Sequence, residues 1–176
     1  MIIVSGPSTI GKNPFIYKAC SLFNYNYIIP YTTRAIRSDE VDGRDYHFLL
    51  KEEFQHRIQT ASIRDWDYCL QNYYGYVFDF PGEKGLITHG LSRLALRLKY
   101  KYPHKITTVF LMPYNIESIN ENLKMIYSGT SLILRQALVE EEICHSALFD
   151  QVYTVSNSVF ELFNKQEVVN VFHAER

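Results

Sequence analysis

Cysteine is scarce and scattered in this sequence. Cys20, Cys69 and Cys144 are its three cysteines and form no C-x-x-C pair, so we expect neither a disulfide framework nor a structural zinc site. An excess of charge is also lacking, because 18 basic and 19 acidic residues leave a net charge of −1. Without a basic surface, we expect no binding to nucleic acid or to an anionic membrane.

Long apolar runs are missing as well. No stretch approaches the roughly 20 apolar residues of a membrane-spanning helix, and no basic segment precedes the short apolar start. We therefore expect a cytoplasmic protein. The chain, 176 residues, is long enough for one sizeable core and short for two. A single domain with insertions is expected over residues 1–176.

Short apolar runs rich in β-branched residues alternate with segments of helical spacing. The runs that predict buried strands are 2–4, 106–111 and 151–155. The segments that predict helices are 13–23, 91–100, 116–125 and 131–144. Asn115 is the expected N-cap of the third helix. This alternation predicts an α/β fold with a parallel sheet that helices cover on both faces.

Residues 34–80 depart from the alternation. Residues 34–43 form a charged stretch that predicts a loop, and residues 51–59 predict a short helix. The aromatic-rich segment 61–80 predicts short strands with a break at 72–75. We expect an inserted lobe over the mouth of the sheet. The core would then consist of residues 1–33 and 81–176.

A glycine-rich turn follows the first predicted strand. Gly6, Gly11 and Lys12 match the first seven positions of the phosphate-binding pattern G-x-x-x-x-G-K-[ST]. Backbone N–H groups at a helix start point into one concavity and favour an anion, and Lys12 can reach the β- and γ-phosphates. The alternative is a plain strand-to-helix turn. The predicted nucleotide-binding residues are Gly6, Pro7, Ser8, Thr9, Ile10, Gly11, Lys12 and Asn13.

Two residues of this turn depart from the pattern. Asn13 offers an amide oxygen where a hydroxyl would bind Mg²⁺, and Pro14 has no backbone N–H to donate to phosphate. Proline is tolerated in a first helical turn, so folding is not expected to suffer. We expect weaker contacts to metal and phosphate.

A second constellation lies in the charged loop and just after it. Arg34 and Arg37 are three residues apart, and Tyr46 follows them. Two guanidinium groups and a phenol that converge on one point form a receptor for a phosphate dianion. The alternative is a solvated loop in which these arginines pair with acidic neighbours. Those neighbours are Asp39, Glu40 and Asp42.

Taken together, the two stretches resemble the guanylate kinase family. GPSxxGK is followed by TTRxxRxxExxGxDYxF and, at residues 72–75, by N-x-Y-G. The resemblance is strongest over residues 1–80 and weak beyond them. It implies a P-loop, three-layer α/β core with a parallel sheet, an inserted lobe for a nucleoside monophosphate, and a short lid at about 122–134. It also implies ATP as the phosphoryl donor, with Mg²⁺, and GMP or a related purine monophosphate as the acceptor.

The resemblance further implies roles for individual residues. Arg34, Arg37, Tyr46 and Tyr74 would hold the acceptor phosphate, and Glu40 would support the two arginines. The catalytic cations would be Lys12, from the glycine-rich turn, and Arg135, from the helix after the lid. For Arg135, an exposed helix arginine near Glu140 is the alternative.

Departures from the family pattern fall at its base-reading, metal and lid positions. Asp65 and Tyr76 stand where the family reads guanine with a glutamate and a serine, so the base of the acceptor stays open between guanine and a different or modified purine. Residues 86–89 lack the family's D-x-D carboxylates, and we assign no metal ligand. Residues 122–126 replace the R-x-x-x-R lid and contain one basic side chain, Lys124.

Three functions stay open at this point. The first is a guanylate-kinase-like nucleoside monophosphate kinase. The second is a catalytically impaired module that binds a monophosphate or a phosphorylated protein partner without phosphoryl transfer, because the acceptor residues remain while metal and lid residues are missing. The third is a kinase for another phosphorylated acceptor, such as a sugar phosphate. Outside the motifs, His89 is interpreted as structural, and the acidic run 140–142 as a solvated helix face.

Overall fold

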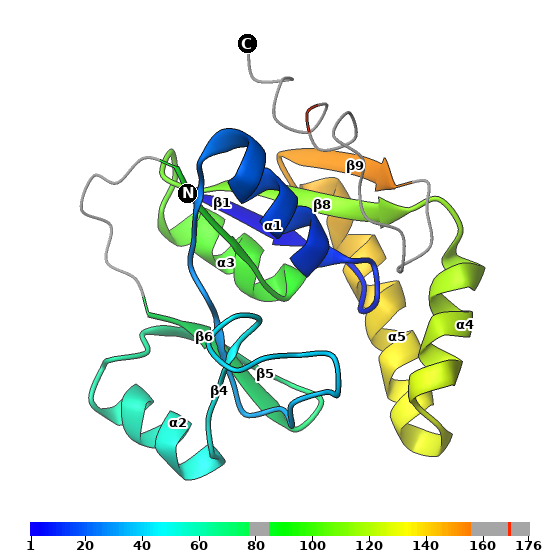
Figure 1. Ribbon diagram of the computed structural model, residues 1–176, viewed down its shortest axis with the longest axis horizontal. Helices are drawn as coiled ribbons and strands as arrows, with labels where there is room; N and C mark the ends of the chain where they lie inside the picture. Colours follow the sequence, from blue (N-terminus) through cyan, green and yellow to red (C-terminus); the bar gives the residue numbers. More distant parts are fainter. Residues whose placement is uncertain (78–84, 156–168, 170–176) are drawn as a thin grey trace.

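The computed structural model describes residues 1–77, 85–155 and 169 (Figure 1). Among these residues, the larger sheet has five parallel strands in the order β2-β7-β1-β8-β9. Its strands are β1 (Ile2–Ser5), β2 (Asn26–Tyr27), β7 (Leu86–His89), β8 (Thr107–Pro113) and β9 (Gln151–Val155). The α/β fold with a parallel sheet that the alternation predicts is confirmed. β1, which leads into the glycine-rich turn, lies at the centre of the sheet.

Helices cover both faces of this sheet. They are α1 (Lys12–Phe23), α3 (Ser92–Lys101), α4 (Ile116–Ile126), α5 (Gly129–His145) and the short 3₁₀ helix η1 (Ser146–Leu148). Side chains alternate along β1: Ile2 and Val4 pack into the core under α1 and α4, whereas Ile3 packs with α3 on the opposite face. The predicted cap is confirmed, because the Asn115 side chain accepts a hydrogen bond from the Glu117 backbone N–H at 2.8 Å.

A smaller, four-stranded sheet with one helix forms the lobe, which we define as residues 31–76. Its strand order is β4-β3-β6-β5. The elements are β3 (Tyr31–Thr32), β4 (His47–Phe48), α2 (Lys51–Gln59), β5 (Asp65–Cys69) and β6 (Asn72–Tyr76). The helix predicted over residues 51–59 is confirmed, and the sheet begins at Tyr31, ahead of the expected boundary at 34. Figure 1 shows the lobe on one side of the core, with α4 and α5 projecting beside it.

The break between strands that was predicted at residues 72–75 is wrong. These residues belong to β6, and the turn lies one step earlier, at Leu70 and Gln71, whose φ angles are 47° and 63°. Gly75 lies inside the strand, where a side chain has no room: a Cβ there would lie 2.8 Å from the Ile63 Cγ2 atom. The glycine therefore marks a close approach between the strand and its neighbours, not a turn.

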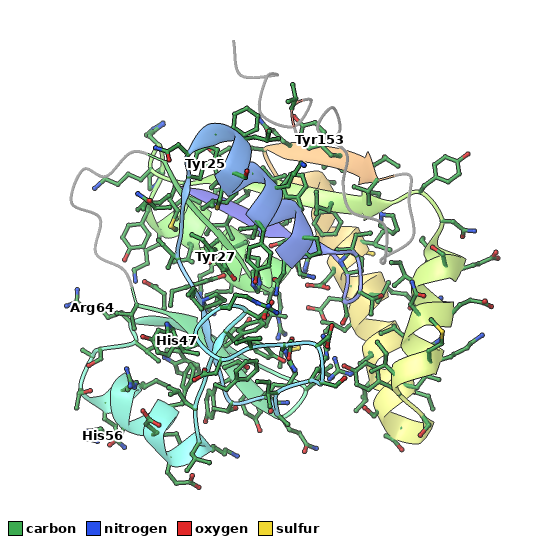
Figure 2. All side chains as sticks on the ribbon, viewed as in Figure 1. Tyr25, Tyr27, His47, His56, Arg64 and Tyr153 are labelled. Carbon is green, nitrogen blue, oxygen red and sulfur yellow. The ribbon has the colours of Figure 1, made fainter. Side chains whose placement is uncertain are left out.

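The sides of the lobe differ in their surroundings. Figure 2 shows His56 and Arg64 on the outer side of the lobe and Tyr27 near the junction of lobe and core.

Residues 78–84, which include the end of the predicted lobe, lie outside the described residues. Within the described part of the chain, no helix combines the length and apolar character needed to cross a bilayer.

Candidate functional site

A cavity of about 430 Å³ lies where the glycine-rich turn, the lobe and α5 meet. The turn contributes Ser8, Thr9, Gly11, Lys12 and Asn13. The lobe and α5 contribute residues that include Arg34, Arg37, Glu40, Tyr46, Tyr74, Arg135 and Glu142. One cavity therefore contains residues from both halves of the site predicted from the sequence.

The backbone of the turn explains its two glycines. Gly6 has a φ of 147°, and a Cβ at this position would lie 2.6 Å from the Leu111 carbonyl oxygen. Gly11 is the N-cap of α1 with a φ of 88°, in the left-handed region that favours glycine. No side chain caps this helix start, so its backbone N–H groups are available to an anion.

Lys12 turns back onto the loop that carries it. Its Nζ donates hydrogen bonds to the Gly6 carbonyl oxygen at 2.6 Å and the Pro7 carbonyl oxygen at 2.9 Å. Burial lowers the pKa of Lys12 to about 8. Gly6, Pro7 and Ile10, which complete the predicted loop, do not line the cavity: Ile10 packs into the core.

Glu40 fixes Arg34 and orients the start of the Arg37 segment. The Arg34 guanidinium donates two hydrogen bonds to the Glu40 carboxylate, at 3.0 and 2.6 Å. The Arg37 backbone N–H donates to the same carboxylate at 2.9 Å. Burial opposes the charge of Arg34, but the bonds from Glu40 outweigh it and raise the pKa of Arg34. These contacts hold Arg34 and the Arg37 backbone together, and the role of Glu40 in supporting a phosphate site stays a prediction.

Arg37 and Arg135, which come from the lobe and from α5, contact the same aromatic ring. Arg37, from the lobe, donates to the Tyr127 hydroxyl at 2.6 Å. Arg135, from α5, places its guanidinium carbon 3.9 Å from the centre of the Tyr127 ring. The buried Nε atom of Arg135 has no hydrogen-bond partner among the described residues, and burial lowers the pKa of this guanidinium. Arg135 therefore lines the cavity instead of lying exposed beside Glu140.

Two tyrosines and a histidine complete the wall near Arg34. The Tyr46 ring packs at 6.4 Å from the Tyr74 ring and at 4.9 Å from His89, between ring centres. The Tyr46 hydroxyl lies 3.4 Å from His89 Nδ1. Burial, followed by the nearby charge of Lys12, lowers the pKa of His89 to about 3. His89 is therefore a neutral cavity residue at physiological pH, a placement beyond the structural role predicted for it.

The sequence is similar to known proteins over most of its length. A family model for guanylate kinase matches residues 1–79. The chain is 30% identical over 184 residues to a guanylate kinase of Streptococcus thermophilus. This match covers 99% of the chain and 86% of the relative. This chain belongs to the guanylate kinase family. It is also 31% identical to a guanylate kinase of Synechocystis, over 89% of the chain and 85% of the relative.

The fold agrees with that membership. The crystal structure of guanylate kinase from Anaplasma phagocytophilum superposes with a TM-score of 0.75, covering 99% of this chain and 82% of that one. Because the two sequences are only 18% identical, this likeness shows the fold. The sequence resemblance to guanylate kinases is strongest in the first 80 residues, but the similarity of the backbone fold includes the described residues beyond them.

The two residues expected at the guanine-reading positions of the family do not line the cavity. Asp65 is buried and accepts a hydrogen bond from Lys101 Nζ at 2.6 Å. Tyr76 is 2% exposed, and its hydroxyl donates to the His89 carbonyl oxygen at 2.8 Å. A Cβ on Gly90 would lie 1.8 Å from that hydroxyl, so the tyrosine fills the space above Gly90. Both side chains are engaged with protein partners, Asp65 with Lys101 and Tyr76 with the His89 backbone.

Three residues of the site were missed by the sequence analysis or misplaced by it. Glu142 was expected on a solvated face, and this was wrong: it is 3% exposed and lines the cavity. Asp45, which lies inside the family pattern GxDY, is buried and accepts a hydrogen bond from Asn13. Tyr127 had no local signal. The helical spacing of residue 142 from Arg135, two turns away on one face, could have identified Glu142.

The Mg²⁺ that the guanylate kinase family implies finds no ready set of ligands. No three acidic, histidine or cysteine side chains of the described residues are grouped to hold a metal ion. Thr88, in the strand that lacks the D-x-D carboxylates, donates its hydroxyl to the Ile28 carbonyl oxygen at 2.7 Å. The Asn13 amide is engaged with Asp45. These residues do not fit a protein-built Mg²⁺ site, so a cation here would be held chiefly by nucleotide phosphates.

Proposed function

We propose that this protein is a nucleoside monophosphate kinase of guanylate kinase type, which transfers the γ-phosphoryl group of ATP to GMP or a related purine monophosphate. The observation that carries the proposal is that Lys12, on one wall of the cavity, and Arg34 and Arg37, on another, line the same space. Phosphoryl transfer needs donor and acceptor phosphates side by side and in line. A single cavity of this kind supports that arrangement.

The acceptor phosphate is assigned to the lobe. Arg34 is held in place by Glu40 before any ligand arrives, so little side-chain entropy is lost when it binds a phosphate. Arg37 is less fixed, because its side chain is 31% exposed. Tyr46 and Tyr74 add hydroxyl donors beside these guanidinium groups. Four donors around one dianion are consistent with recognition of a monophosphate.

The donor phosphates are assigned to the turn. Lys12 would exchange its two carbonyl partners for phosphate oxygens, while the first N–H groups of α1 bind the same anion. Arg135 faces the cavity from the other side and would contact the transferring group. Phosphoryl transfer asks little covalent chemistry of the protein, so positioning and charge neutralisation carry it. Mg²⁺ bound to ATP would neutralise part of the phosphate charge.

A binding module without phosphoryl transfer is not favoured. The relatives that match over most of this chain are named guanylate kinases. In addition, the glycine turn keeps Gly6, Gly11 and the half-buried Lys12, which a module that binds only the acceptor does not need. The kinase interpretation uses both walls of the cavity.

The test is a coupled assay of ADP release with ATP, Mg²⁺ and GMP. We expect ADP release to require GMP and to be lost in Lys12→Ala. In Arg37→Met, the affinity for GMP should fall by about tenfold or more, because a charge-assisted contact is removed. Arg57→Met is the matched control, since Arg57 lies on α2 and pairs with Glu53 outside the cavity. Monophosphate binding without any Lys12-dependent ADP release would contradict the proposal and favour the module.

A further inference from the structure

Glu142 differs from its two acidic neighbours on α5. It is 3% exposed and lines the cavity. Its Oε1 accepts one long hydrogen bond, 3.4 Å, from the Ser92 backbone N–H, and it forms no ion pair with any cation in the described ranges. Glu140 is exposed, and Glu141 pairs with Arg93 at 3.4 Å on the surface. A buried carboxylate without a contacting cation is costly unless another charge lies near it.

The nearby charge is Lys12, which lines the same cavity as Glu142. Burial raises the pKa of Glu142 to about 7, and Lys12 opposes that rise more than any other charge around it. In turn, burial lowers the pKa of Lys12 to about 8, and Glu142 is the charge that opposes this fall. Other titratable or charged groups of the described residues that act on one member of the pair include Glu141, Arg93, Arg37, Cys69 and His89.

The inference concerns the same site and rests on the proposed function. We propose that Glu142 is the counter-charge of Lys12 in the empty enzyme and that it takes up a proton from solvent when the ATP phosphates bind Lys12. The step is an acid–base one: a carboxylate oxygen of Glu142 gains an O–H bond, and no other bond is made or broken. Glu142 thereby acts as a positioning residue for Lys12.

The sign of the effect follows from electrostatics. ATP brings several negative charges into a cavity where screening by water is weak, and it takes over Lys12 as its partner. An ionised Glu142 would then face phosphate without its counter-charge, so its neutral form becomes favoured. ATP binding should take up protons, and its affinity should fall as the pH rises through 7 to 8, by up to about tenfold per pH unit for each proton taken up.

Infrared difference spectroscopy of the whole enzyme, with ATP and Mg²⁺ added and GMP omitted, tests the protonation directly. We expect a new band of a protonated carboxyl group on ATP binding, larger at pH 8 than at pH 6, where Glu142 is already protonated. Glu142→Gln should lose the band. This variant keeps an oxygen acceptor for Ser92, so it removes the charge without removing the contact. Glu140→Gln, the same change on the exposed face of the helix, should keep the band.

Titration calorimetry of ATP separates the two proposals. If ATP binds but produces no such band, or the band survives in Glu142→Gln, the role of Glu142 is overturned while the kinase proposal stands. If ATP does not bind the wild-type protein, the proposed function falls, and this inference with it. Should Glu142→Gln fail to fold, calorimetry of the wild type in two buffers with different heats of ionisation still decides, because absence of proton uptake at pH 7.5 overturns the proposal.

Discussion

Asn13 in the glycine-rich turn donates its side-chain N–H to Asp45 in the lobe, with 2.7 Å between Nδ2 and Oδ1. Tyr17 of α1 donates its hydroxyl to the same oxygen at 2.8 Å. The backbone N–H of Val41 and the Nε of Arg44 donate to the other carboxylate oxygen, both at 2.9 Å. One carboxylate, 4% exposed, therefore ties the start of α1 to the lobe.

Replacing Asp45 by asparagine should destabilise the protein by about 1–3 kcal/mol, because the amide cannot accept all four hydrogen bonds and a buried donor is left unpaired. Burial alone would raise the pKa of Asp45, but these hydrogen bonds outweigh it and lower the pKa. The stabilisation is therefore present above the ordinary carboxyl pKa and is lost as the pH falls through the lower, folded value. Urea unfolding at pH 7 and at pH 3 should show a smaller difference between variant and wild type at pH 3. Asp39→Asn, on the exposed part of the same loop, is the control.

Tyr127 is expected to matter through its ring more than through its hydroxyl. Tyr127→Phe keeps the stacking on Arg135 and loses only the hydrogen bond from Arg37, so kcat should stay near the wild-type value. Tyr127→Ala frees both guanidinium groups and should lower kcat/KM for GMP by about tenfold, the size of one cation–π contact plus a charged hydrogen bond in a partly wet site. Steady-state kinetics on the two variants measures this, and equal losses in both would contradict the role of the ring.

Base selectivity should change when the two departures at the base-reading positions are reversed together. Tyr76→Ser opens the space above Gly90, and Asp65→Glu adds the methylene that the family has at this position. The double variant should raise the ratio of kcat/KM for GMP over that for AMP, because removing the Tyr76 ring clears the space beside Gly90, a cavity residue, and leaves a hydroxyl and a longer carboxylate there for a guanine edge. Each single change should do less, since Asp65 is also paired with Lys101. A wild-type ratio in the double variant argues against any role of these positions in base recognition.

His89 should make the protein sensitive to acid. Its pKa in the folded state is lowered to about 3, so below the ordinary histidine pKa the unfolded chain binds a proton that the folded protein does not. Stability from this group is full above about pH 6.5 and falls as the pH drops towards 3, with a slope of up to about 1.4 kcal/mol per pH unit. Denaturant unfolding between pH 7 and 4 should show this slope in the wild type and a flatter one in His89→Gln.

The parts of the fold that could be predicted have local causes. The helix at residues 51–59 and the Asn115 cap depend on side chains within one or two turns, and both are confirmed. The turn at Leu70 and Gln71 escaped prediction because neither residue is a typical turn former, whereas Gly75 is one and serves packing against Ile63 instead. A glycine alone does not distinguish a turn from a close contact.

The site was predictable where a motif spans it and not elsewhere. Arg34 and Glu40 fall in one short pattern, and the family resemblance implied the contact that the structure shows between them. Glu142 was hidden in a run of three glutamates, because the sequence of a run does not state which member faces inwards. Asp65 was assigned by position, but the direction of its side chain depends on Lys101, which lies 36 residues away. Such long-range partners carry no local signal.

Tyr76 belongs to the lobe by its backbone and to the core by its hydroxyl. Its strand pairs with β5 and β3 of the lobe, while the hydroxyl is fixed to the carbonyl oxygen of His89 at the end of β7. This buried hydrogen bond and the one between Asn13 and Asp45 therefore join the lobe to the core at two separate points. Two points of attachment restrict rotation of the lobe relative to the core more than either would alone.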